Sequence, residues 1–125
     1  MNTIHDYEIE RFTVEFKKNT ISIDISSEQR QKQIVFQEVF CYKFYEEMPY
    51  SIISDLEERP IEDFFKENKE LLNQTKNYAW PIMYDSIQEL VNKIKDADVH
   101  YQVLSSSYGM NGWVLAKRVE IIDLN

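Results

Sequence analysis

The sequence predicts an α+β fold, an antiparallel sheet of about five strands with two helices packed on it, in the order βββααββ. Apolar residues alternate with polar ones, the period of a strand, before residue 46 and after residue 98. Between these parts they recur at helical spacing. The chain of 125 residues is 43% apolar, which suits one domain, 1–125, with one core.

The first three strands follow from two kinds of apolar pattern. Within 9–16 the residues Phe12, Val14 and Phe16 alternate with polar ones, and every second residue is apolar in 21–25, which predicts a hairpin with one apolar face. The run 34–45 has apolar residues on both faces. A strand of this kind is covered on both sides, so we expect it at the centre of the sheet.

Two helices are predicted in the middle of the chain. Pro60 suits a first helical position, and the apolar residues of 61–72 follow the period of an amphipathic helix of roughly four turns. The second helix begins with the capping-box pattern of Ser86 and Glu89 and is expected to end near Ala97. Between the helices, 77–83 is an irregular connector, and 79–81 is expected to be extended because a proline follows Trp80.

A second hairpin ends the chain. The runs 99–103 and 113–121 return to period two, and both glycines of the chain lie between them, in 105–112. This stretch is expected to form an exposed loop. Such loops often bind partners, and Tyr108, Met110 and Trp113 would give this one an adaptable apolar contact.

Acidic charge is the second candidate for recognition. The net charge is −8, and 46–70 holds nine acidic and three basic residues, so it carries −6 of that total. Nucleic acid is excluded as a ligand because its binders need clustered Lys and Arg. Glu57, Glu58, Glu62 and Asp63 are the candidate contacts for a basic protein. The alternative is a solvated face that serves solubility.

Residues for catalysis, cofactor binding or metal binding do not form a recognisable set. His5 and Asp6 are adjacent, but the chain has only two histidines and no spacing typical of a metal site. Cys41 lies in the predicted central strand and is expected to be a core thiol. The serines of 105–107 lack a nucleophile elbow, and the glycines lack a phosphate-loop pattern. We therefore expect a protein that is not an enzyme and needs no cofactor.

Location follows from what the sequence lacks. No apolar run is long enough to span a membrane, and the N-terminus does not read as a signal peptide. The single cysteine cannot form an internal disulfide. A cytoplasmic protein that binds no membrane is expected.

Part of the pattern resembles a known group of proteins. His5-Asp6 precedes a hairpin, and an aromatic strand follows with the form Ile34-x-Phe36-x-x-Val39-x-x-Tyr42-x-Phe44. Together they resemble small uncharacterised bacterial proteins, some of which look like immunity proteins of polymorphic toxin systems. The similarity covers the first 45 residues and, loosely, the last strand pair. It implies a cytoplasmic protein that neutralises one toxin by binding it, and an acidic patch would suit a basic toxin.

Three hypotheses of function remain open from the sequence. The first is a non-enzymatic protein-binding domain, of the immunity type, that recognises a basic partner through its acidic surface. The second is a small-ligand-binding domain or small enzyme with a pocket between sheet and helices, lined by Tyr42, Trp80, Tyr84 and Tyr101. The third is a homodimer, in place of a monomer, formed through an exposed sheet edge or the connector 78–81.

Overall fold

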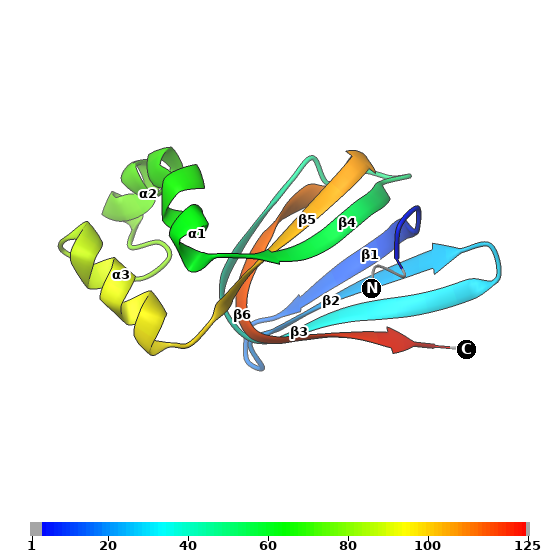
Figure 1. Ribbon diagram of the computed structural model, residues 1–125, viewed down its shortest axis with the longest axis horizontal. Coiled ribbons are helices and arrows are strands. Elements are labelled where there is room, and N and C mark those ends of the chain that lie inside the picture. Colours follow the sequence, from blue (N-terminus) through cyan, green and yellow to red (C-terminus); the bar gives the residue numbers. More distant parts are fainter. Residues whose placement is uncertain (1–3, 125) are drawn as a thin grey trace.

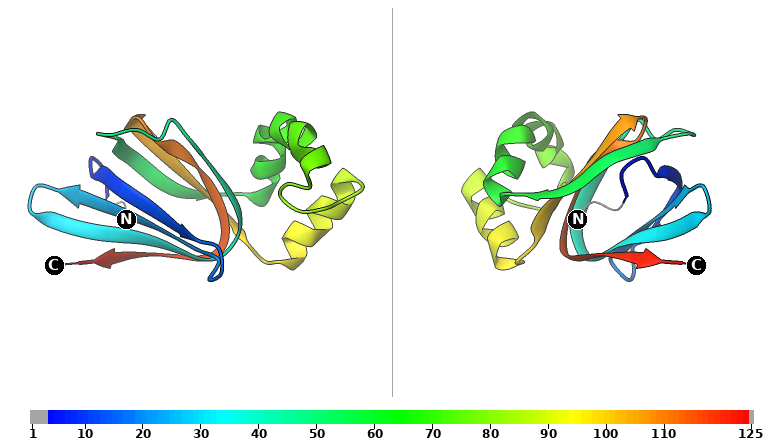
Figure 2. Two further views of the ribbon diagram at one scale, coloured as in Figure 1. Left: turned by 180° about the vertical axis from the view of Figure 1, so that it is seen from behind. Right: turned by 45° about the vertical axis from the view of Figure 1, so that its right-hand side comes forward.

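Six antiparallel strands form a closed barrel, and a helical lobe is inserted between the fourth and fifth strands, as a computed structural model describing residues 4–124 shows (Figure 1). The strands follow one another around the barrel in the order β1-β2-β3-β6-β5-β4. Their bounds are β1 (Glu8–Glu15), β2 (Thr20–Ser27), β3 (Arg30–Tyr45), β4 (Ile52–Arg59), β5 (His100–Tyr108) and β6 (Asn111–Asp123). The lobe holds α1 (Ile61–Glu67), α2 (Lys69–Thr75), the short 3-10 helix η1 (Lys76–Tyr78) and α3 (Ile87–Asp96). It sits at one end of the barrel in every view (Figure 2).

The predicted α+β class and antiparallel sheet are confirmed, but the counts and the order of the elements were wrong. The described chain has six strands and three α-helices. The additional strand is β4, which precedes the helices, and the predicted first helix is divided into α1 and α2. In β4 only Ile52, Ile53 and Leu56 are apolar, and the acidic residues after them hide the period of a strand. Pairing with β5 along its length makes this segment a strand.

A buried asparagine divides the predicted first helix. Asn68 leaves the helical conformation, with φ −116° and ψ 20°, between α1 and α2. Its Nδ2 donates to the carbonyl of Phe64 at 3.0 Å. Asparagine side chains compete with the backbone in this way, and so they interrupt helices.

The capping box of the last helix is confirmed. The backbone N–H of Glu89 donates to Ser86 Oγ at 3.2 Å, and Glu89 Oε1 accepts from the N–H of Asp85 at 2.7 Å. The helix ends at Asp96, as expected. In the connector before it, Ala79 adopts a left-handed conformation with φ 57°, so the expectation of an extended 79–81 was wrong at that residue. The Trp80–Pro81 bond is cis.

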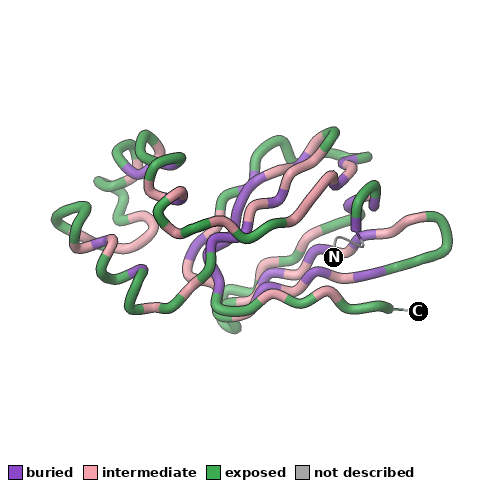
Figure 3. Tube along the Cα trace, viewed as in Figure 1, coloured by how far each residue is buried: buried purple, intermediate pink, exposed green. Residues whose placement is uncertain are grey.

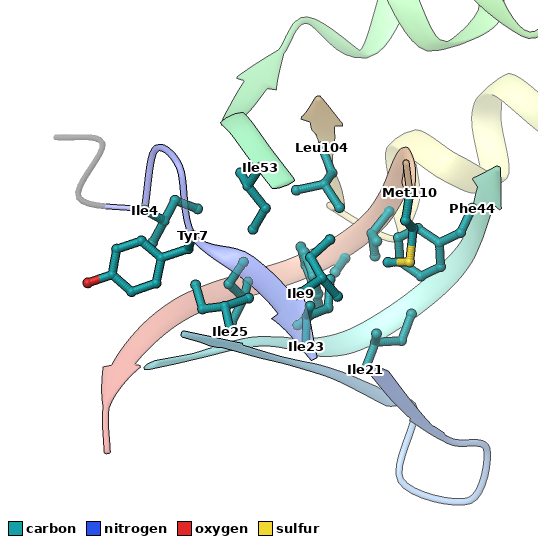
Figure 4. Packing of buried hydrophobic residues seen from close by; sticks show 14 residues of the cluster. Ile4, Tyr7, Ile9, Ile21, Ile23, Ile25, Phe44, Ile53, Leu104 and Met110 are labelled. Carbon is teal, nitrogen blue, oxygen red and sulfur yellow. The ribbon is translucent and has the colours of Figure 1, made fainter. Parts of the chain in front are cut away.

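The barrel encloses the main hydrophobic core. Side chains from all six strands converge inside it, and Met110 closes the cluster from the β5–β6 turn (Figure 4). The isoleucines that alternate in 21–25 are all buried here, as the hairpin pattern predicts.

A second cluster lies between the barrel wall and the helices. β3 contributes side chains to both clusters, so its predicted cover on both sides is confirmed, but a closed barrel has no central strand. A bulge between Val39 and Cys41 interrupts its register with β6. Beyond it Cys41 packs on the outer side against the lobe, together with Phe64, Leu72, Leu90, Ile94, Tyr101, Trp113 and Leu115. Much of the lobe's remaining surface is exposed (Figure 3).

Candidate functional site

The candidate acidic residues lie on two consecutive elements. Glu57 and Glu58 are exposed on β4, and Glu62 is exposed on α1. Asp63, also on α1, is half-buried. The chain passes directly from β4 through Pro60 into α1, so these four carboxylates belong to one junction between barrel and lobe (Figure 1).

Several carboxylates of the junction are engaged in local pairs. Arg59 Nη2 lies 3.5 Å from Asp63 Oδ2 and also contacts Glu67. Glu58 Oε2 lies 2.9 Å from Nδ1 of His100. The charge of Asp63 and Glu67 is thus offset by Arg59. The acidic surface available to a partner is smaller than the sequence alone indicates.

Tyr101 links this network to the barrel. Its hydroxyl donates to Glu67 Oε1 at 2.8 Å and accepts from Asn68 Nδ2 at 3.4 Å. Burial, together with the carboxylate of Glu67, raises the pKa of Tyr101 to about 12. The network therefore fixes the first helix of the lobe to β5.

Two acidic side chains of the junction, and Glu70 on α2 just beyond it, remain available. Within residues 4–124, Glu57, Glu62 and Glu70 form no ion pair, and all three are exposed. They are the carboxylates that a basic partner could contact without competition from a neighbouring arginine. The Glu58 side chain is also exposed, but its carboxylate pairs with His100.

The exposed apolar contact predicted for Tyr108, Met110 and Trp113 is wrong for two of these residues, because they are buried. Strands β5 and β6 continue to Tyr108 and from Asn111, which leaves a tight turn. Met110 is 2% exposed and belongs to the barrel core, while Trp113 is 4% exposed and packs against the lobe. Only Tyr108, 52% exposed, lies on the surface.

Ser51 explains why this turn is tight. Its buried hydroxyl accepts from the N–H of Met110 at 2.8 Å and donates to the carbonyl of Met48 at 2.7 Å. Gly109 has φ 82°, and a Cβ there would collide with the Ser51 side chain. Both glycine properties, the positive φ and the missing Cβ, are thus needed for structure.

An aromatic groove lies between the barrel and the lobe. Its volume is about 460 Å³, and its lining comes from the β1–β2 hairpin, β3, α2 and the connector. The lining residues are Phe16, Tyr42, Lys43, Phe44, Glu47, Leu71, Thr75 and Trp80. A smaller hollow of about 170 Å³ shares three of these residues and is also lined by Pro81.

The groove agrees only in part with the pocket expected from the sequence. Tyr42 and Trp80 line it, but Tyr84 and Tyr101 do not. The Tyr84 hydroxyl donates to the carbonyl of Leu72 at 3.3 Å, and Tyr101 belongs to the acidic network. Phe16, 77% exposed, was missed as a lining residue because the period of β1 placed it on the buried face. Phe16 lies just after the last residue of β1, so the alternation of the strand no longer directs its side chain into the core.

The remaining sequence candidates carry no assembled chemistry. Cys41 is buried, as expected, and burial raises the pKa of its thiol. His5 Nδ1 lies 3.1 Å from Asp6 Oδ2, and both side chains are exposed. In the part of the chain that the structure describes, no group of three or more His, Cys, Asp or Glu side chains could hold a metal ion.

Comparisons with protein-family models, with curated proteins and with solved structures found no match. Among the helices of residues 4–124, none is long and apolar enough to cross a membrane.

Proposed function

We propose that this protein is a non-enzymatic binding domain that recognises a basic protein partner through the junction of β4 and α1. The observation that carries the proposal is the pair of exposed junction carboxylates, Glu57 and Glu62, which, with Glu70 on the neighbouring α2, have no ion pair in the described chain. Opposite charge on a partner speeds its association and orients it. The resemblance to immunity proteins supports one candidate for this partner, a basic toxin that is neutralised by being bound.

A neutralising double variant tests the proposal. Glu57→Gln/Glu62→Gln removes two charges and leaves the Arg59 network and the Glu58–His100 pair intact. The matched control is Glu28→Gln/Glu120→Gln, which removes two exposed charges from the β2–β3 turn and from β6. Each protein is used to capture basic proteins from native cytosol at low and at high salt, with mass spectrometry of what is retained.

The expected result is a basic protein held at low salt by the wild type and the control, and released at high salt. The Glu57→Gln/Glu62→Gln variant should retain at least tenfold less of it. Equal retention by both variants would refute the role of the junction, and the absence of any salt-sensitive basic protein would refute the function itself.

The aromatic groove favours a second candidate function, binding of a small ligand. Its volume of about 460 Å³ falls in the range of ligand pockets, and Lys43 and Glu47 add charged groups to an aromatic lining. A thermal-shift screen with aromatic compounds and nucleosides tests it. A hit supports the candidate only when its stabilisation is lost in Tyr42→Ser, and a screen without such a hit removes it.

A further inference from the structure

The closure of the barrel between β1 and β4 is short. The N–H of Ile53 donates to the carbonyl of Tyr7 at 2.9 Å, and the N–H of Asp6 donates to the carbonyl of Ile53 at 2.8 Å. The only ladder pair between the two strands joins Glu8 to Ile52. Beyond it the two strands separate, although both run toward the end of the barrel that carries the lobe (Figure 1).

The backbone of β4 beyond this closure faces an open side. The backbone N–H and C=O of Ile53 point toward β1. A bulge at Ser54 shifts the register with β5, so after it the backbone groups of Leu56 point to that same side. The N–H of Leu56 donates to the carboxylate of its neighbour Asp55 at 2.8 Å. Because backbone groups alternate along a strand, Glu58 points its N–H and C=O the same way. No strand of residues 4–124 pairs with β4 on this side after Ile53.

Acidic residues line both strands beside the opening. β1 carries three carboxylates and one arginine, and β4 carries the same numbers. Proteins place charges on an open edge to prevent pairing with other chains, and the Asp55 carboxylate bound to Leu56 is such a protection. These carboxylates repel acidic segments but attract a segment rich in lysine or arginine.

We propose that the partner docks by strand addition, with an extended basic segment that pairs with the open side of β4 from Leu56 to Arg59. This inference rests on the proposed function and names its mode of recognition. The added strand supplies a carbonyl to Leu56 N–H in place of the Asp55 carboxylate, and it exchanges backbone hydrogen bonds with Glu58. Main-chain bonds give affinity in such complexes, and alternate side chains give specificity. Its basic side chains lie beside Glu57, Glu58 and Glu62.

A synthetic peptide of seven alternating lysine and valine residues, with both ends blocked, is the probe. Two control peptides are compared with it. One is N-methylated at alternate residues and so cannot pair along one edge, and the other has glutamate in place of lysine. Binding is followed by NMR at low salt, together with hydrogen exchange of the individual backbone amides. The expected result is at least fivefold slower exchange at Leu56 and Glu58 with the lysine peptide alone.

Two variants of one residue separate pairing from charge. Glu58→Pro removes the edge N–H together with the carboxylate, whereas Glu58→Gln removes the charge and keeps the N–H. Proline is tolerated where the N–H faces away from the ladder, so β5 pairing should survive, and circular dichroism checks this. Strand addition predicts at least tenfold weaker peptide binding by Glu58→Pro than by Glu58→Gln.

Each other outcome overturns a defined claim. Equal binding by the two Glu58 variants, or by the methylated peptide, removes strand addition and leaves the acidic surface. Failure of the lysine peptide, with the Glu57→Gln/Glu62→Gln effect on capture present, also removes strand addition alone. Failure of both experiments removes the proposed function as well.

Discussion

Replacing Tyr101 with phenylalanine tests the network that joins the lobe to the barrel. The hydroxyl makes its shorter bond, 2.8 Å, to a carboxylate oxygen of Glu67. Asn68 would not be left without a partner, because its Nδ2 also donates to the carbonyl of Phe64. The change therefore removes one charge-assisted hydrogen bond and creates no buried orphan.

The expected loss is about 1–1.5 kcal/mol of unfolding free energy, at or below the lower end for a bond to a charged group. The Glu67 side chain is 37% exposed, so water replaces part of the lost interaction. For a chain of this length the loss lowers Tm by roughly 3–5 °C. Tyr108→Phe is the control, since that side chain is half exposed and should shift stability by less than about 0.5 kcal/mol.

The effect has a pH dependence with a definite sign. Burial and Glu67 raise the pKa of Tyr101 to about 12 in the folded protein, whereas an unfolded tyrosine ionises near 10. A raised pKa adds stability below pH 10, and this stability is lost as pH rises from 10 toward 12. Tyr101→Phe lacks the group, so its deficit against the wild type should shrink above pH 10.

Urea denaturation of both proteins between pH 7 and 11 measures this difference. Other tyrosines titrate in both proteins and cancel in the comparison. A deficit below about 0.3 kcal/mol at pH 7 would contradict the hydrogen-bond argument. A deficit that stays constant up to pH 11 would contradict the raised pKa.

Three further substitutions or reactions test the barrel. Gly109→Ala should lower the unfolding free energy by more than about 2 kcal/mol in urea titration, because it combines a positive φ with a collision against Ser51. Ser51→Ala should cost about 1–3 kcal/mol in the same assay, since it leaves the N–H of Met110 buried without an acceptor; a cost below 0.5 kcal/mol would mean that water replaces the hydroxyl. Cys41 should react with a thiol reagent only after denaturant is added, because its thiol is buried and its pKa raised; rapid reaction of the native protein would show an opening of the lobe.

A local sequence pattern was sufficient to predict an element where its buried residues all lie on one side of that element. The isoleucines of β2 alternate without interruption, and Ser86 with Glu89 marks the start of α3, so both could be predicted from neighbouring residues alone. The acidic candidates Glu57 and Glu62 are exposed, as charged side chains are expected to be. Local patterns also placed Cys41 in the core.

Other features depend on residues far apart in the chain. β4 is a strand because β5 pairs with it, and Asn68 ends α1 in a buried setting that its own neighbours do not reveal. Met110 and Trp113 look like loop residues until Ser51 tightens the turn and the lobe covers the barrel wall. Phe16, in contrast, follows the apolar period and yet is exposed.

The sequence by itself determined the α+β class, the antiparallel hairpins, the buried alternation and the acidic middle segment, because each depends on residue type at short spacing. Only the tertiary structure decided that the sheet closes, that Arg59 and His100 engage carboxylates of the acidic segment, and that Leu56 and Glu58 face an open side of β4. These outcomes depend on which strands become neighbours. In the closed barrel the neighbouring strands bring together residues that lie too far apart in the chain for any short sequence window to contain them both.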